Sequence, residues 1–203
     1  MFRTAAGALA AAFLGAVAPA SPVQAATATA FAVTVVTVNG SGCPNSTATA
    51  RVLPDGTSFT IDFGGYFAWA GGDASPTAFR RNCQFAIQIT PEEGMTYAVA
   101  NAEYSGFALL NDGVTGVQAA HYYFQGQSAT IAGSHQFTGP LADTWATTDA
   151  IAPEDMVFAP CLDQRNLNVN TELRLTPQPA SADLSAMVMD PSITLHLAWR
   201  TCA

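Results

Sequence analysis

The residues best suited to chemistry are three histidines, four cysteines and a few carboxylates in strand-like segments. Histidine is the commonest metal ligand, so His121, His135 and His196 are tested first. The alternation around Gly126 places His135 on the inner face of its strand, whereas His121 and His196 face outward. Because side chains on opposite faces cannot bind one ion, the sequence predicts no metal centre and no cofactor. His135 is expected to bond to Gln118 in the core instead.

Carboxylates are the second candidates for chemistry. Hydrolysis of a glycosidic bond requires two carboxyl groups held about 5 to 9.5 Å apart. Asp62, Glu103 and Glu172 lie in strand-like segments and are the candidates for such a pair, but no spacing singles out two of them. The chain also has no G-x-S-x-G nucleophile elbow. We therefore assign no catalytic residue, and keep an extracellular hydrolase with a carboxylate pair as an alternative.

Aromatic side chains in glycine-rich surroundings are candidates for ligand binding. Tyr66 and Trp69 lie in segment 64–76, which its glycines predict to be a loop, and Trp145 lies near turn-like residues. An exposed flat ring can stack on a sugar face or on the apolar patch of a partner. The opposite interpretation, that these rings fill the ends of the core, stays open.

Three asparagines form the second candidate binding element. Asn166, Asn168 and Asn170 alternate along one strand face, where their amides can form hydrogen bonds with hydroxyl groups or form a plain polar surface. The leading hypothesis is a non-enzymatic protein that binds a polysaccharide or another protein. A secreted inhibitor or toxin that acts on a protein target is a further alternative.

The first 25 residues have the pattern of a secretory signal peptide. Arg3 supplies a positive charge, segment 5–17 is apolar, and Val23-Gln24-Ala25 is a small-x-small cleavage site. The apolar run is shorter than the roughly 20 residues of a membrane span. We therefore expect residues 1–25 to be removed and residues 26–203 to form one secreted domain.

Charge and cysteine content agree with export. The formal net charge of −8 becomes −9 once Arg3 is removed, which disfavours nucleic acid and anionic membranes as partners. Four cysteines in an exported chain predict two disulfides, for which three pairings exist. We favour Cys43 with Cys83 and Cys161 with Cys202, because these pairs close two independent loops, each worth about 4 kcal/mol in the chain-entropy model.

The strands that must position these residues follow a period of two. Around Gly126 the alternation predicts a hairpin in which Tyr122 faces Ile131, and a type II′ turn if Gly126 and Gln127 are the two loop residues. About ten such strands predict a single-domain antiparallel β-sandwich, with a partly closed β-barrel as the alternative.

Two other segments carry specific expectations. Segment 31–38 is apolar on both faces and is predicted to lie deep in a sheet. Segment 95–110 is predicted as a strand pair or one bent strand, with a bulge at Gly106.

Several short motifs together resemble a known family. They are, in order, Val38 to Pro44, Ser75-Pro76-Thr77, Arg80 to Gln84, Tyr122 to Gln127, Pro160-Cys161, Leu167 to Asn170 and Trp199 to Cys202. This ordered set is similar to DUF4360, a family of small secreted proteins of unknown function. The resemblance implies a secreted single domain with two disulfides, and it brings no catalytic residues.

Overall fold

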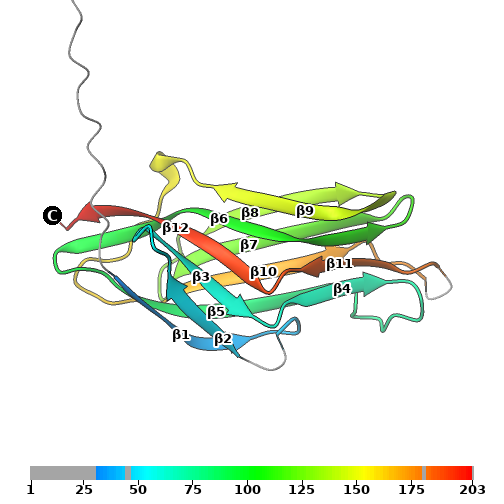
Figure 1. The fold of residues 1–203 in the computed structure, drawn as a ribbon, viewed down its shortest axis with the longest axis horizontal. Helices are drawn as coiled ribbons and strands as arrows, with labels where there is room; N and C mark the ends of the chain where they lie inside the picture. The colour runs from blue at the N-terminus through cyan, green and yellow to red at the C-terminus, as the bar shows by residue number, and fades with distance from the viewer. Residues whose placement is uncertain (1–30, 44–46, 180–181, 203) are drawn as a thin grey trace, which may run out of the picture.

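The structure is a computed structural model that describes residues 31–43, 47–179 and 182–202. The predicted leader, residues 1–25, lies outside the described residues. Within those residues the regular structure consists of twelve strands and one short 3-10 helix, η1 (Pro153–Asp155). The strands form two antiparallel sheets packed face to face (Figure 1). The predicted all-β sandwich is confirmed.

The smaller sheet has five strands in the order β1-β5-β10-β7-β8. Their bounds are β1 (Ala32–Asn39), β5 (Arg80–Thr90), β10 (Leu167–Leu175), β7 (Thr115–Phe124) and β8 (Ile131–Thr138). In β5, Phe85 and Ile87 are fully buried while Gln88 is exposed. This alternation gives the sheet one apolar inner face and one polar outer face.

The larger sheet has seven strands, of which two pairs lie end to end. The strands are β2 (Ala48–Val52), β3 (Ser58–Phe63), β4 (Tyr66–Ala70), β6 (Met95–Leu110), β9 (Leu141–Ala150), β11 (Ser185–Met189) and β12 (Ser192–Thr201). β3 and β4 follow one another along one line and pair with β12 and β11 respectively. One edge of β6 pairs with β12 and then β11, and its other edge pairs with β9. β4 therefore lies at a sheet edge, two strands away from β6.

The core fills the space between the two sheets. Phe59, Ile61 and Leu195 of the larger sheet face Phe85 and Ile87 of the smaller one, and all five are fully buried. Burying a side chain of this size contributes roughly 1.5–3 kcal/mol. A barrel, the alternative prediction, is wrong because β8 and β9 lie side by side at one open edge and do not pair (Figure 1).

Two disulfides link segments that are far apart in the sequence. Cys43 is bonded to Cys83, and Cys161 is bonded to Cys202, with Cα–Cα distances of 5.5 and 5.7 Å. These distances are typical of disulfides in proteins. The predicted pairing is confirmed.

The N-terminal strand lies elsewhere than the sequence predicted. Segment 31–38 was expected deep in a sheet, but β1 is an edge strand that pairs with β5 alone. The pairing is irregular between Val35 and Thr37, and Val36 is exposed. Apolar residues on both faces predict burial on both sides, whereas β1 is covered on one side only.

The central hairpin has the predicted register but a different turn. Tyr122 pairs with Ile131 and Gln118 with His135, as expected. The Gln127 amide donates to the Phe124 carbonyl at 3.0 Å, so Gln125 and Gly126 are the central turn residues. Gly126 has φ 78° in the third position, which is typical of a type II turn. The predicted type II′ turn is therefore wrong: the turn is of type II, and its central residues lie one position earlier than Gly126 and Gln127.

Segment 95–110 is one continuous strand, and Gly106 is not its bulge. The irregularity in β6 falls between Val99 and Asn101, opposite β12. Gly106 lies on the inner face, where a Cβ atom would overlap the Trp145 ring and the Val188 carbonyl. Glycine is therefore needed here for a close approach of side chain and backbone.

Candidate functional site

An exposed apolar stripe crosses three strands of the larger sheet. It consists of two cross-strand rows, Phe67–Val188–Phe107 and Trp69–Ala186–Leu109, on β4, β11 and β6. Phe67 is 53% exposed, Phe107 42%, Leu109 39% and Val188 38%. Isolated exposed apolar residues are common, but contiguous ones mark interaction surfaces. We call these six residues the apolar stripe.

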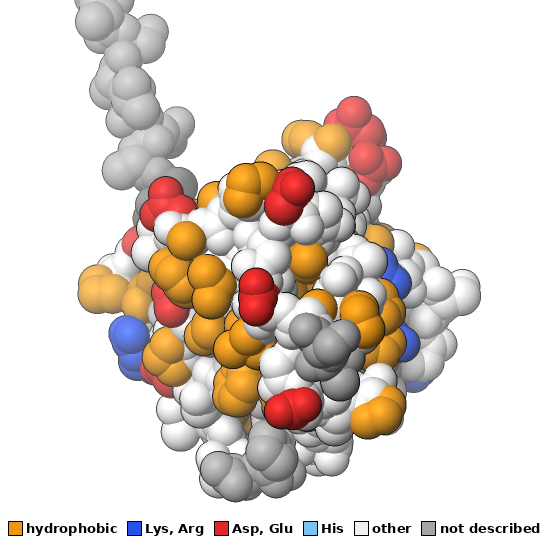
Figure 2. All heavy atoms as spheres, turned by 90° about the vertical axis from the view of Figure 1, so that its right-hand side faces the viewer, with side chains coloured by type: hydrophobic (Ala, Val, Ile, Leu, Met, Phe, Trp, Pro, Cys, Tyr) orange, Lys and Arg blue, Asp and Glu red, His pale blue; other side chains and the backbone are white. Residues whose placement is uncertain are grey.

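The local sequence explains why these side chains face outward. In β4, Tyr66, Ala68 and Ala70 point into the core, so Phe67 and Trp69 must point out. The end of the sandwich that carries β4, β11 and the start of β9 is seen in Figure 2. Hydrophobic side chains gather on this face, and acidic side chains lie between them.

Trp69 forms one end of the apolar stripe and has two ring contacts. Its ring lies 4.7 Å from that of Phe67, centroid to centroid, and the Arg81 guanidinium lies 5.0 Å from the Trp69 centroid. A hollow of about 340 Å³, lined by Phe67, Trp69, Arg81, Ser41 and Thr47 among others, borders this cluster. The stripe is therefore continuous with a hollow that offers both apolar and polar contacts.

The segment around Tyr66 and Trp69 is a strand, not the predicted loop. Tyr66 is buried, and its hydroxyl donates to Thr171 Oγ1 at 2.9 Å. Burial raises the pKa of Tyr66, and the hydrogen bond to Thr171 opposes this shift. Since Tyr66 faces the core and Trp69 faces out, only Trp69 of this pair is placed to contact a ligand.

Trp145 is also buried rather than exposed at a turn. It lies in the middle of β9, where its ring fills the space above Gly106 and packs on Phe137 with centroids 5.6 Å apart. The Trp145 ring is part of the hydrophobic core and does not belong to the apolar stripe.

Asn168 and Asn170 lie on the outer face of β10 in the smaller sheet, and Asn166 directly precedes this strand. Asn168 is nevertheless only 9% exposed. Asn168 is flanked by Ala86 on β5 and Tyr123 on β7, and Asn170 by Gln84 and His121. A shallow trough of about 370 Å³ runs past Ala86, Tyr123, Asn166 and Asn168. The small side chain of Ala86 leaves this space, and amides border it. This trough is a second candidate surface, on the face opposite to the apolar stripe.

A buried hydrogen-bonded network joins the two sheets at their open edge. His135 Nε2 lies 2.6 Å from Asp149 Oδ1, and the Tyr122 hydroxyl donates to Asp149 Oδ2 at 2.6 Å. The Tyr122 and Tyr104 hydroxyls lie 2.5 Å apart. A Cβ atom on Gly133 would overlap the Asp149 carboxylate, so the glycine makes room for it.

This network corrects the expected partner of His135. Gln118 lies opposite His135 as predicted, but its Oε1 accepts from Thr147 Oγ1, and His135 contacts Asp149 instead. Desolvation, together with the negative charge of Asp149, raises the pKa of Tyr122 and of Tyr104. Both phenols therefore stay protonated and serve as donors at neutral pH.

The carboxylates proposed for hydrolysis do not come together. Asp62 lies on β3 beside Arg51, and Glu103 lies on β6 with an oxygen 3.4 Å from His196 Nε2. Glu172 lies on the other sheet, where it pairs with Arg80 at 2.6 Å. Each of the three lies beside a basic or histidine side chain and not beside a second carboxylate across a cleft.

The histidines are likewise separated. His121 lies on β7 and His196 on β12, in different sheets. Among residues 31–43, 47–179 and 182–202, no group of three histidine, cysteine or acidic side chains is arranged to hold a metal ion. In the same ranges no helix has the length and apolar character needed to cross a bilayer.

Sequence reasoning named Trp69 but missed most of the apolar stripe. Phe107 and Leu109 lie in segment 95–110, which was predicted as a strand pair or one bent strand without an outward face, and Val188 lies in a segment for which the sequence made no prediction. The useful signal is that the inward positions of β6 beside them are Gly106 and Ala108, so the larger side chains are the outward ones.

Comparison with known proteins identifies the family. The family model "Domain of unknown function (DUF4360)" matches residues 29–202. An uncharacterized secreted protein of Arthroderma benhamiae is 32% identical over 171 residues, which are 82% of this chain and 70% of the relative. The predicted secretion agrees with the description of this relative.

Similarity to solved structures is weak. The enzymatically active domain of tailspike protein 4 of bacteriophage CBA120 has a TM-score of 0.29 and 12% identity, over 81% of this chain and 19% of the tailspike chain. The broad bean stain virus structure has a TM-score of 0.28 and 11% identity, over 93% of this chain and 94% of the viral chain. Neither likeness is high enough to inform function. The sequence match over nearly all described residues is decisive, and the chain belongs to the DUF4360 family.

Proposed function

We propose that this protein is a secreted, non-catalytic binding protein that attaches to an insoluble polysaccharide through the apolar stripe. The observation that carries the proposal is the cross-strand row Phe67–Val188–Phe107, in which all three side chains are substantially exposed. Together with Trp69 it supplies three aromatic rings on one sheet face. Aromatic rings bind sugars by packing on the apolar faces of the pyranose rings.

The spacing of the rings suits a polymer. Phe67 and Phe107 are two strands apart, which is roughly 10 Å at the usual strand spacing. This separation is close to the length of two linked sugar rings. Because the rings project from one sheet face and not into a deep groove, they favour the flat surface of a packed polymer over a single soluble chain.

The charge around the apolar stripe favours a neutral ligand. None of its six residues is charged, and Arg81 at its margin is placed over the Trp69 ring. The protein as a whole is acidic. We therefore expect neutral polymers such as cellulose or chitin to bind better than anionic ones, which the overall charge repels.

The asparagine trough is the competing surface for a sugar ligand. Its amides can form hydrogen bonds with hydroxyl groups, but it offers one aromatic side chain, Tyr123, whose hydroxyl already accepts from Gln84 Nε2 at 3.2 Å. A ligand bound there would depend on Asn168 and not on Trp69. This difference separates the two surfaces experimentally.

The test is a depletion isotherm on microcrystalline cellulose and on chitin with the purified, oxidised protein. We expect saturable binding that Trp69→Ala and Phe107→Ser each weaken about tenfold, or about 1.4 kcal/mol. Leu162→Ala removes another fully exposed apolar side chain outside the stripe and should change nothing. Loss of binding in Asn168→Ala alone would move the site to the trough. Absence of binding to any polymer would contradict the proposal and direct the search to a protein partner.

A further inference from the structure

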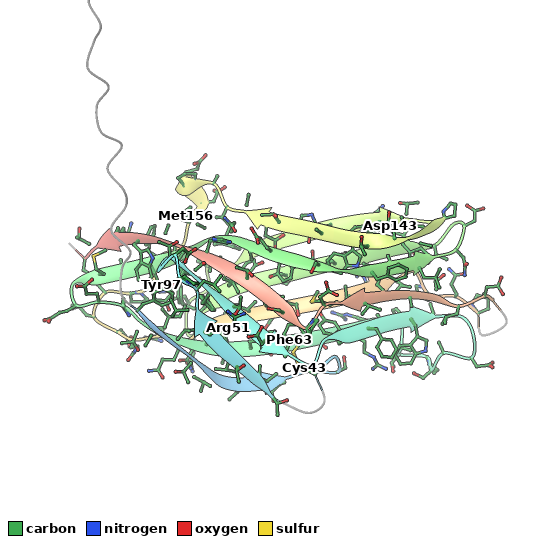
Figure 3. The ribbon with its side chains drawn as sticks, viewed as in Figure 1. Cys43, Arg51, Phe63, Tyr97, Asp143 and Met156 are labelled. Atoms are coloured by element: carbon green, nitrogen blue, oxygen red, sulfur yellow. A yellow bond between two sulfur atoms is a disulfide. The ribbon has the colours of Figure 1, made fainter. Side chains whose placement is uncertain are left out.

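We propose that the hollow beside Trp69 is a binding site for a single carboxylate group carried on a ring-shaped molecule. The hollow has a volume of about 340 Å³. This lies at the lower end of the roughly 300–1,000 Å³ that small-ligand sites usually span. Figure 3 labels Cys43, which lines the hollow, on the lower side of the view, and Asp143 of β9 on the upper side.

Arg81 is the one charged side chain among the described residues that line the hollow. All 15 acidic residues of the chain lie in the described ranges, and none of them forms an ion pair with Arg81. Arg51, Arg80 and Arg165, in contrast, each pair with a carboxylate. In a protein with a formal net charge of −8, the Arg81 guanidinium is therefore available to an anion from outside.

The position of the Arg81 guanidinium suits a carboxylate. Arg81 is half-buried, and its guanidinium lies over the Trp69 ring, 5.0 Å from the centroid. Stacking of this kind uses the flat face of the guanidinium and leaves the N–H groups at its edge open. A carboxylate matches that edge with two parallel hydrogen bonds, which are stronger than bonds between neutral groups.

The outer edge of β4 adds a second donor. β4 pairs with β11 alone, and the Trp69 amide donates to the Ala78 carbonyl at 3.0 Å, on the side away from β11. Residues two apart on a strand point their N–H groups in the same direction, so the Phe67 amide also points away from β11. Because Phe67 and Trp69 both line the hollow, this amide stands at the border of the site.

The aromatic wall explains why the carboxylate should be carried on a ring. Phe67 is 53% exposed, and its ring lies 4.7 Å from that of Trp69 at an interplanar angle of 32°. Two nearly parallel rings offer a flat apolar surface for the face of a sugar or of another aromatic ring. A ligand that packs on these rings brings its carboxylate to Arg81.

The opposite wall is fixed before a ligand binds. Cys43 is bonded to Cys83, two residues after Arg81 on β5. The Gly42 amide donates to the Asn82 carbonyl at 2.8 Å, and Ser41 Oγ donates to Asn82 Oδ1 at 3.1 Å. These bonds hold segment 41–43 beside the arginine. Binding therefore requires little ordering of the protein, which favours affinity.

A carboxylate in the hollow is compatible with a neutral ligand on the apolar stripe. The six residues of the stripe carry no charge, whereas the hollow at its Trp69 end contains Arg81. A polymer charged on every unit is repelled by the acidic protein as a whole, but a single carboxylate is offset by one guanidinium. The inference goes beyond the proposed function, because it requires no contact with Phe107 or Val188.

The test compares two pairs of probes in which a carboxylate is exchanged for an alcohol. Methyl β-D-glucuronide is paired with methyl β-D-glucoside, and phenylacetate with 2-phenylethanol. Each probe is titrated into isotopically labelled, oxidised protein, and the NMR shifts of the Phe67 amide and the Trp69 indole N–H are followed. We expect saturable shifts, with the carboxylate bound about tenfold more tightly than its matched alcohol, as a charge-assisted hydrogen bond would give.

The two pairs distinguish the sources of the carboxylate. A preference in the sugar pair alone would assign an acidic sugar unit to the hollow, and a preference in the aromatic pair alone would assign a free aromatic acid. A preference in both pairs would show that the carboxylate decides binding whichever ring carries it. Absence of a carboxylate preference in both pairs would overturn the proposal.

Two substitutions with the same change of charge isolate the role of Arg81. Arg81→Gln should bring the carboxylate and the alcohol of each pair to equal affinity. Arg80→Gln removes the neighbouring guanidinium, which is exposed and paired with Glu172, and should retain the tenfold preference. If the preference survived in Arg81→Gln, Arg81 would not be the partner of the carboxylate. Adsorption to cellulose is measured separately, so either proposal can fail without the other.

Discussion

The buried hydroxyls of Tyr104 and Tyr122 differ from that of Tyr97 in whether they have a hydrogen-bond partner. Tyr104 and Tyr122 belong to a network that ends on Asp149 and His135, so each hydroxyl has a protein partner. The hydroxyl of Tyr97, at the end of the sandwich, has none among the described residues. The first group joins the two sheets where their edges do not pair, whereas the Tyr97 ring packs between Phe124 and Trp199.

The comparison teaches how to separate stability from binding in this fold. A buried hydroxyl that is bonded within the protein contributes to folding, whereas an unpaired one lowers stability until something else binds it. The Asp149 network should therefore be sensitive to substitution in the free protein. Loss of the Tyr97 hydroxyl should have little effect on the stability of the free protein at neutral pH.

The largest expected effect comes from removing the carboxylate at the centre of the network. Asp149→Ala leaves Tyr122 and His135 without their shared acceptor and should lower the free energy of unfolding by about 3 kcal/mol, measured by urea denaturation. Asp143→Ala, an exposed residue on the same strand, is the matched control and should change it by less than about 0.5 kcal/mol. Equal effects of the two variants would show that the network does not stabilise the edge.

A smaller effect is expected at alkaline pH. Burial raises the pKa of Tyr97, as it does for Tyr104 and Tyr122, so these phenols keep their protons in the folded state when the unfolded chain loses them near pH 10. Stability should be complete below pH 10 and fall as the pH rises above it, because the folded state binds more protons.

Each such tyrosine contributes a slope of up to about 1.4 kcal/mol per pH unit. Tyr97→Phe should therefore reduce the pH dependence of the free energy of unfolding between pH 10 and 11 by about this amount. An identical slope in the variant would mean that Tyr97 ionises as readily in the folded protein as in the unfolded chain.

The smallest effect is expected for Tyr97→Phe at neutral pH. The lost hydroxyl has no partner to leave unsatisfied, so the free energy of unfolding should stay within about 0.5 kcal/mol or rise slightly. Tyr122→Phe, the same chemical change within the network, should lower it by about 1.5 kcal/mol. A large loss in both variants would remove the distinction between the two groups.

The sequence predicts the parts of this fold that depend on local pattern. Alternation and a turn glycine give the pairing of Tyr122 with Ile131, and the order of the cysteines along the chain suggests the disulfides. Contacts between the two sheets cannot be predicted in this way. His135 on β8 contacts Asp149 on β9 only because the sheets pack together, and the pattern of neither strand shows how they do so. Only the structure shows that position 133 needs a glycine, because the Asp149 carboxylate fills the space that a Cβ atom would occupy.

The candidate site was predictable only in part, for a related reason. Alternation identifies which residues share a face, but a strand with large apolar side chains on both faces does not show which face is covered. Trp69 was found because glycines surround it, whereas Phe107 and Val188 lie in apolar segments for which no outward face was predicted. The position of β4 at a sheet edge, which leaves Phe67 uncovered, is set by the end-to-end arrangement of β3 and β4.

The order of the two disulfides has a consequence for export. Cys43 pairs with Cys83 and Cys161 with Cys202, so each cysteine is bonded to its neighbour in the sequence and the two loops do not overlap. A chain that crosses a membrane from its N-terminus presents the first pair before the second has emerged. Bonds that form in order of arrival are then already the native ones, and oxidation can keep pace with translocation without reshuffling.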